Sequence, residues 1–208
     1  MEQLILRYPA LEVCRESMHK AFDMLFETYC LGGKILLCGN GGSCCDCEHI
    51  VGELMKGFML ERKPSEEFVS QLEKLYGRQL AEQMAKNLQG AIPAISLPSQ
   101  ASVISAFSND VDADMVYAQL VYGYAKPGDT VVGLTTSGNS LNVVNALMVA
   151  KSMGVKTLAL TGNKPSKCDE ICDCVIKAPE SETYKVQEYH LPIYHWLCAQ
   201  LEKKIFKS

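Results

Sequence analysis

The sequence lacks the features that would point to a membrane or to nucleic acid. No apolar run approaches the roughly 20 residues of a transmembrane helix. The first residues, MEQLILRYPALEV, lack the basic region and the cleavage site of a signal peptide. Basic residues are not in excess, because 20 lysines and arginines stand against 24 aspartates and glutamates. We therefore predict a cytoplasmic protein with no membrane partner and no nucleic-acid partner.

Two common phosphate-binding signatures are also missing. The stretch GNGGS at 39–43 is not followed by the G-K-[ST] of a Walker loop. As a dinucleotide fingerprint it fails because Cys44 stands at the position of the third glycine. No strand that ends in an acidic residue follows at the expected distance either. Both kinds of nucleotide site are therefore disfavoured.

What the sequence does contain is a pattern of short apolar runs separated by helical segments. At 208 residues the chain is long enough for one full α/β domain over 1–208. Five runs read as buried strands because they are short and continuously apolar. They lie at 34–38, 92–97, the start of 130–140, 157–163 and 174–179. Strands that alternate with helices predict a parallel sheet covered by helices on both faces.

Helical spacing of apolar residues predicts the elements between the strands. An N-terminal helical region covers 1–31, with Pro9 ending or bending its first piece. Ser43 is expected to cap a helix that continues through 49–58. A helix over 141–154 closes at Gly154, and a long amphipathic helix covers about 184–205. The charged segment 64–90 is amphipathic, and Gly77 is expected to divide it into two helices.

Two similar loops stand out. GNGGS at 39–43 and TSGNS at 136–140 each follow a strand and precede a helix. Such a loop brings backbone N–H groups, hydroxyl groups and the positive end of a helix together, which suits a phosphate dianion. Ligands of parallel sheets bind beyond the carboxyl ends of the strands, so we expect two arms of one site. Neither loop contains lysine or arginine, which favours a sugar phosphate; the alternative is that both are only tight turns.

The ten cysteines are expected to be reduced, because no export signal precedes them. Cys44 and Cys47 form a C-x-x-C, and a second cluster contains Cys168, Cys172 and Cys174. We favour a role as small buried hydrophobic residues. The alternative is a zinc site made of thiolates from both clusters. At the start of a helix, Cys44 and Cys45 are expected to have a lowered pKa.

A histidine and a glutamate follow the first loop. His49 and Glu53 are four residues apart on the predicted helix, so their side chains share one face. Gln187 and His195 are eight apart in the last helix, about 80° apart around its axis. Pro192 lies between them and removes a helical hydrogen bond, so a kink would change that angle. Taken singly, Glu53 and Gln187 are best interpreted as residues of a solvated helix face, and His49 and His195 as residues of such a face or as core histidines. His19 and His190 are interpreted in that ordinary way.

In combination, these motifs resemble one family. The pattern is GNGGS, then His49-x-x-x-Glu53, Asn109-Asp110, TTSGNS, LTG at 160–162, and Q-E-x-H from Gln187 with His195 beyond it. It is similar to that of the phosphoheptose isomerases, which are sugar isomerase (SIS) domain proteins. The resemblance covers nearly the whole chain outside 60–90. It implies a single SIS domain, a five-stranded parallel sheet between helices, and a homotetramer with active sites at subunit contacts.

The resemblance also implies an activity and its residues. Family members convert sedoheptulose 7-phosphate into D-glycero-D-manno-heptose 7-phosphate through an enediol. Glu53 and His195 match the acid/base pair, and the implied zinc ion would be held by His49, Glu53, Gln187 and His195. A carboxylate that binds zinc is a poorer base than a free one, so the role of Glu53 as a zinc ligand conflicts with its role as a base. The implied substrate-binding residues are Gly41, Gly42, Ser43, Glu53, Asn109, Asp110, Thr135, Thr136, Ser137, Ser140 and Gln187.

Alternatives to this activity stay open. A DnaA-binding replication initiation factor of the same superfamily forms the same kind of tetramer without being an isomerase, but it has asparagine where His195 stands. An isomerase or a sensor of another phosphosugar is a further alternative. The segment 64–90 is interpreted as a helical insertion, and Pro192 replaces an ordinary helical residue. Thr135 stands where serine is usual and keeps the hydroxyl.

Overall fold

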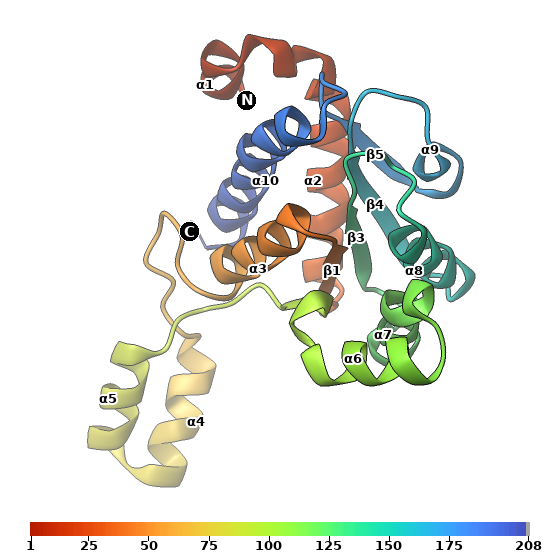
Figure 1. Cartoon of the computed structure of the whole chain (residues 1–208). Coiled ribbons are helices and arrows are strands. Elements are labelled where there is room, and N and C mark those ends of the chain that lie inside the picture. The colour runs from red at the N-terminus through yellow and green to blue at the C-terminus, as the bar shows by residue number, and fades with distance from the viewer. Residues whose placement is uncertain (207–208) are drawn as a thin grey trace.

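The computed structural model describes residues 1–206 and shows a parallel sheet between two layers of helices (Figure 1). The last two residues of the predicted domain, 207–208, lie outside this description. The sheet has five strands in the order β2-β1-β3-β4-β5, which confirms the predicted fold class. Their bounds are β1 (Ile35–Gly39), β2 (Ala94–Ser96), β3 (Thr130–Leu134), β4 (Lys156–Thr161) and β5 (Cys174–Lys177).

The strands read as continuous apolar runs because both faces of the sheet are covered. Every residue of β1 and of β3 is buried. Successive side chains of a strand point to opposite faces. In β1, Ile35 and Leu37 belong to the core on one face, while Leu36 and Cys38 belong to the core on the other.

One layer contains α2 (Arg15–Cys30), α3 (Gly42–Met55) and α10 (Thr183–Phe206), whose apolar side chains share the first core. The other contains α6 (Ala101–Asp110), α7 (Val116–Tyr124), α8 (Leu141–Ser152) and α9 (Lys167–Ile171). A short helix, α1 (Glu2–Arg7), precedes α2, and Pro9 opens a 3-10 turn between them, as predicted. The helix α10 continues through Pro192. The sequence did not predict α6 and α7.

The start of α3 differs from the prediction. Gly41 is its N-cap residue at a φ of 56°, and Ser43 lies buried inside the first turn without a capping hydrogen bond. A positive φ is easily adopted only by glycine, and it turns the chain into the helix before Ser43. The predicted cap is therefore wrong, although the helix itself is confirmed.

The end of α3 is also earlier than predicted, at Met55. The backbone N–H groups of Phe58 and Met59 donate to the carboxylate of Glu202 on α10, each at 2.8 Å, instead of continuing the helix. Arg62 forms a buried ion pair with the same carboxylate at 2.7 Å and donates to the carbonyl oxygen of Glu53 at 2.8 Å. This buried pair fixes the end of α3 against α10.

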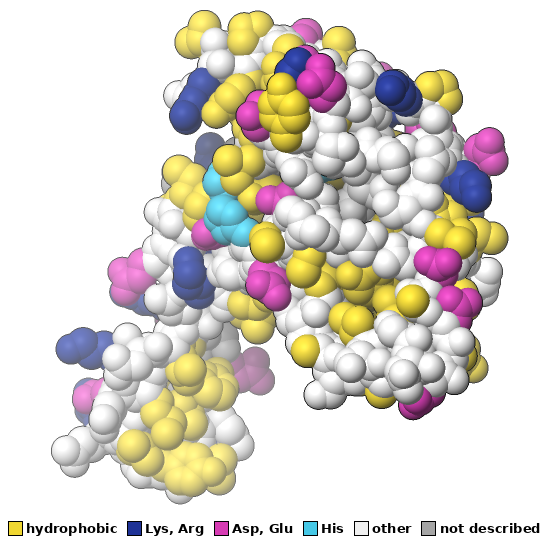
Figure 2. Space-filling model, in the orientation of Figure 1, with side chains coloured by type: hydrophobic (Ala, Val, Ile, Leu, Met, Phe, Trp, Pro, Cys, Tyr) yellow, Lys and Arg dark blue, Asp and Glu magenta, His cyan; other side chains and the backbone are white. Residues whose placement is uncertain are grey.

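The segment 64–90 forms a helical hairpin of α4 (Glu66–Tyr76) and α5 (Arg78–Asn87) that projects from the body (Figure 1). Gly77 separates the two helices at a φ of 85°, as predicted. No residue of α4 is buried, and apolar side chains gather on the surface of the hairpin (Figure 2). They include Phe68, Leu75, Tyr76, Leu80 and Met84. None of the helices within residues 1–206 has the length and apolar character needed to cross a membrane.

The strand order places the two glycine loops side by side. The chain leaves β1 for β2 on one side and later returns to β3 on the other, so β1 and β3 flank the point where the order reverses. Gly39 pairs with Leu134 at the carboxyl ends of these strands. Crevices at such a reversal are the usual ligand sites of parallel sheets.

Candidate active site

The two loops are joined by a pair of asparagines. The side-chain amide of Asn40 donates to Asn142 at 2.8 Å, and that of Asn142 donates back to Asn40 at 3.0 Å. Asn40 belongs to the first loop and Asn142 to the first turn of α8, directly after the second. The expectation that the loops lie together at one edge of the sheet is therefore confirmed.

The second loop presents hydroxyl groups in a fixed turn. Thr135 is buried, and its hydroxyl lies 3.0 Å from that of Ser140. Gly138 adopts a φ of 67°, and a Cβ there would stand 2.3 Å from Ser166 Oγ, so the turn requires glycine. Thr136 and Ser137 line a hollow of about 190 Å³ outside this turn.

That hollow contains a charged residue that the sequence reasoning missed. Lys164, between β4 and α9, lines it together with Thr136 and Ser137. The two glycine loops themselves lack a cation, as the sequence indicated, but the neighbouring loop supplies one. Lys164 directly follows the predicted strand at 157–163, and that strand ends at the same edge of the sheet as the two glycine loops. This position was the signal in the sequence that could have identified Lys164.

The first loop meets α10 at Gly42. A Cβ on Gly42 would stand 2.7 Å from Nε2 of Gln187, so the absence of a side chain lets the carboxamide lie against the start of α3. Gln187 and the glycine loop are thus neighbours. Gly41 has no such contact and is required for its positive φ.

His49 is the centre of a group formed by α3 and α10. Its Nε2 lies 3.4 Å from Oε1 of Glu53, one turn further along α3, and 3.4 Å from Nε2 of His195. The rings of His49 and His195 meet edge to face, with centroids 5.0 Å apart. Histidine side chains are visible at the surface between α10 and α3 in Figure 2. The structure therefore brings His195 to His49 and Glu53, although it lies far from them in the sequence.

Two further residues support His49, and the sequence reasoning missed both. The hydroxyl of Tyr194 lies 3.0 Å from Nδ1 of His49 and donates to Oδ1 of Asp46 at 3.1 Å. Burial, and then the negative charge of Asp46, raise the pKa of the Tyr194 hydroxyl far above its ordinary value. Tyr194 therefore keeps its proton.

Burial within the group favours the neutral imidazole of His195 and leaves one oxygen of Glu53 without a full set of partners. Burial, reinforced by the neighbouring His49, lowers the pKa of His195. Oε2 of Glu53 is buried without a hydrogen-bond partner, although Lys56 lies 3.6 Å away as an ion pair. The ring of Phe58 covers His195 with a centroid distance of 5.6 Å. Such an unpartnered buried oxygen is costly unless a ligand engages it.

Asn109 and Asp110 stand apart from this group. Both are exposed at the end of α6, and Asn109 donates to the Asp110 carboxylate at 2.8 Å. Among residues 1–206, they make no side-chain hydrogen bond to either loop or to His49. Their expected contact with the sugar stays a prediction.

The cysteines behave mainly as predicted. All ten are free thiols, and those buried in the core are Cys14, Cys38, Cys47, Cys168, Cys174 and Cys198. The pKa of Cys44 is raised, first by burial and then by the charge of Glu48, so the expected lowering at the helix start is wrong for this residue. Within residues 1–206, no three side chains of histidine, cysteine, aspartate or glutamate are arranged to hold a metal ion as they stand. The thiolate zinc site is not supported.

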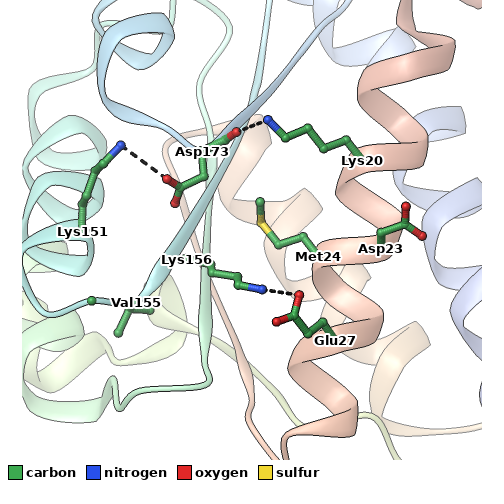
Figure 3. Close-up of a pocket in the computed structure, with 9 residues that line it drawn as sticks. Lys20, Asp23, Met24, Glu27, Lys151, Val155, Lys156 and Asp173 are labelled. Atoms are coloured by element: carbon green, nitrogen blue, oxygen red, sulfur yellow. Dashed lines mark hydrogen bonds and ion pairs between the residues drawn. The ribbon is translucent and has the colours of Figure 1, made fainter.

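A larger hollow, about 500 Å³, lies at the opposite end of the sheet between α2 and the starts of β4 and β5 (Figure 3). Its lysines are already occupied. Lys156 forms an ion pair with Glu27 at 2.5 Å, and Lys20 donates to the carbonyl oxygen of Asp173 at 2.6 Å. Lys151 lies 3.4 Å from the Asp173 carboxylate. With its charges balanced in this way, the hollow does not offer an anion site, and the edge with the glycine loops is the candidate site.

The class of protein emerges from comparison with known families and structures. The family model of the SIS domain matches residues 79–162. The phosphoheptose isomerase GmhA from Neisseria gonorrhoeae has a similar solved structure, with a TM-score of 0.75 and 26% identity over 97% of this chain and 94% of that one.

The particular family follows from curated relatives. The phosphoheptose isomerase of Aliarcobacter butzleri is 34% identical over 94% of this chain and 89% of its own length. That of Maridesulfovibrio salexigens is 35% identical over 86% of this chain and 74% of its own length. The chain belongs to the phosphoheptose isomerase family.

Proposed function

We propose that this protein isomerises sedoheptulose 7-phosphate to D-glycero-D-manno-heptose 7-phosphate through an enediol. The observation that carries the proposal is the group of His49, Glu53 and His195 beside the paired glycine loops. A phosphate at the loops and a carbonyl at this group would engage the two ends of one sugar phosphate.

The spacing along α3 fits a seven-carbon chain. His49 lies seven residues after Gly42, about 10 Å along the helix at 1.5 Å per residue. In an extended heptulose 7-phosphate, the phosphorus lies roughly 9 Å from the C2 carbonyl, given bonds of about 1.5 Å. The phosphate would accept hydrogen bonds from Ser43, Thr136 and Ser137, with Gly41 and Gly42 allowing its approach. Thr135, Ser140, Asn109 and Asp110 are the further proposed substrate contacts, as the family resemblance implies.

The reaction moves a proton between C1 and C2, and a second proton between their oxygens. A carboxylate and a neutral imidazole are suitable for this work, and positioned groups of this kind contribute about 10² to 10⁴-fold in rate. Glu53 and His195 are the proposed pair. The lowered pKa of His195 keeps its imidazole neutral near pH 7, where it can accept a proton or pass one on.

The donor types also suit a zinc ion, although within residues 1–206 these side chains would have to adjust to hold one. Ligands of tetrahedral zinc with bonds of about 2.1 Å are separated by about 3.4 Å. The separations from His49 Nε2 to His195 Nε2 and to Glu53 Oε1 are both 3.4 Å. We propose that His49, Glu53 and His195 hold the ion, with Gln187 as a fourth ligand.

When bound, zinc would polarise the sugar carbonyl as a Lewis acid. Glu53 has two oxygens in different situations, because Oε1 faces His49 while Oε2 has no hydrogen-bond partner. The carboxylate of Glu53 thus offers one oxygen for binding zinc and the other for proton transfer.

A homotetramer with active sites at subunit contacts is part of the proposal. The hairpin of α4 and α5 exposes Leu75 and Tyr76, each 62% accessible. Exposed apolar patches of this kind usually mark an interaction surface. A second copy of the chain would bury it.

The test is a coupled assay on a panel of seven-, six- and five-carbon sugar phosphates. We expect turnover of the heptose pair, and a loss of at least about 100-fold in kcat for Glu53→Gln and for His195→Gln. Glu188→Gln on α10 and His19→Gln on α2 are the matched controls and should retain full activity. Full activity of Glu53→Gln or His195→Gln would refute the assignment. Turnover of a different sugar phosphate would replace sedoheptulose 7-phosphate as the proposed substrate. No turnover together with DnaA binding would favour the non-catalytic alternative.

A further inference from the structure

The hydroxyl of Tyr194 occupies an unusual position beside the candidate site. Tyr194 is 2% exposed, and its hydroxyl bridges Asp46 and His49 across the contact of α10 with α3. The rings of Tyr194 and His49 also meet edge to face, with centroids 5.5 Å apart. None of the activity proposed above uses either Asp46 or Tyr194.

The number of protons in this chain of contacts decides its direction. An ionised carboxylate is only an acceptor, and a tyrosine hydroxyl has one proton to donate. The Tyr194 proton therefore points to Asp46, at 3.1 Å. The Tyr194 oxygen is then free to accept, and the nearest donor is Nδ1–H of His49, at 3.0 Å. The reverse direction would leave the half-buried carboxylate of Asp46 without this donor.

This direction has a consequence on the other side of the ring. In a neutral imidazole only one nitrogen carries a proton, so protonation of Nδ1 leaves the electron pair on Nε2. Nε2 is the atom that lies 3.4 Å from both Glu53 and His195. The hydrogen bond on one nitrogen thus determines what the other can bind.

We propose that Asp46 and Tyr194 are positioning residues that hold His49 as its Nδ1–H tautomer, with the Nε2 electron pair directed at a divalent metal ion between α3 and α10. The inference rests on the zinc site of the proposed function. Outer partners of this kind orient the ring of a metal-binding histidine and make it a stronger ligand, and their loss typically costs 10 to 100-fold in metal affinity.

The variants are Tyr194→Phe and Asp46→Asn. The first removes the acceptor for Nδ1–H. The second lets an amide donate to the tyrosine oxygen, so that the tyrosine proton can turn toward Nδ1 and force the proton of the ring onto Nε2. Tyr189→Phe is the matched control, because Tyr189 is a partly buried tyrosine of the same helix that packs against the same core.

Two measurements test the proposal without measuring turnover. The first is the dissociation constant for Zn²⁺, by competition with a chromophoric chelator. We expect it to rise by about 10 to 100-fold in both variants and to stay unchanged in Tyr189→Phe. The second is the ¹⁵N NMR spectrum of histidine-labelled metal-free protein, at a pH where His49 is neutral. There we expect Nδ1–H in the wild type and Nε2–H in the variants.

The outcomes separate a positioning role from a structural one. Unchanged Zn²⁺ affinity in Tyr194→Phe, even with lower thermal stability, would overturn the proposal, because Tyr194 would then only join the two helices. An Nε2–H signal for His49 in the wild type, or no Zn²⁺ binding by the wild type, would overturn it as well. A protein that binds Zn²⁺ as expected but turns over no sugar would refute the proposed function and leave this inference standing.

Discussion

Acid should weaken this fold in part through His190 on α10. His190 is fully buried, Nε2 lies 3.3 Å from the carbonyl oxygen of Thr161, and Nδ1 has no hydrogen-bond partner. Burial lowers its pKa from 6.5 to about 4, and the contact with Thr161 offsets only part of this effect. The buried ring has no site for the second proton that acid would add.

The magnitude follows from the difference between the folded and unfolded pKa. In the unfolded chain, His190 binds a proton as the pH falls through 6.5, while the folded chain resists until about 4. Within that window the unfolded state binds more protons, so stability falls by about 1.4 kcal/mol per pH unit. The whole shift amounts to about 3 kcal/mol. That is a large part of the roughly 5–15 kcal/mol that stabilises a typical domain.

The assay compares the wild type with His190→Phe and His190→Gln by urea unfolding between pH 7 and pH 4.5, at one protein concentration. Trp196, the only tryptophan, is 8% exposed and reports unfolding by its fluorescence. All other titratable groups are shared by the three proteins, so the difference between the wild-type curve and each variant curve isolates His190. We expect the variants to lose about 1 kcal/mol less per pH unit below pH 6. Parallel curves for the wild type and both variants would refute the argument.

Two further predictions concern Lys164 beside the site and the exposed hairpin of α4 and α5. Lys164→Ala should raise KM for the sugar phosphate by about tenfold with kcat little changed, because a charged hydrogen bond is worth about 1.5–3 kcal/mol. Lys167→Ala is the control. An unchanged KM in Lys164→Ala would show that Lys164 does not belong to the site. Leu75→Glu in the hairpin should convert the proposed tetramer into smaller species in light scattering, because it would place a charge in the proposed apolar contact. Glu67→Gln should leave the tetramer intact, and a wild type with the mass of one chain would contradict the proposed assembly.

The strands and the loops could be predicted because their signals are local. A strand buried on both faces has to be apolar along its whole length, so runs such as 34–38 are conspicuous. The glycines that follow are equally visible. The predicted cap at Ser43 failed because sequence alone did not show that Gly41 would take a positive φ and begin the helix earlier. The early end of α3 was also invisible, since Glu202, which binds the N–H groups of Phe58 and Met59, lies far along the chain.

The candidate site was partly predictable, and the limit has a physical cause. His49 and Glu53 share a face of one helix, which their spacing shows. Their meeting with His195 depends on how α10 packs against α3, and that packing is a property of the whole core. The family resemblance supplied this pairing, and the structure brings the three residues together.

The residues behind the site carried a weak signal that spacing could have revealed. Asp46, His49 and Glu53 follow each other at intervals of three and four, so they form one stripe on α3. Gln187, His190 and Tyr194 repeat the same intervals on α10. The stripe on α3 meets α10 through Tyr194, whereas His190 lies against the carbonyl oxygen of Thr161. A buried polar group requires a partner, so the stripe on α3 predicts a polar contact from the helix packed against it. Tyr194 satisfies Asp46 and contacts His49, and its phenol ring reads in sequence as an ordinary core residue because only its hydroxyl reaches the polar stripe.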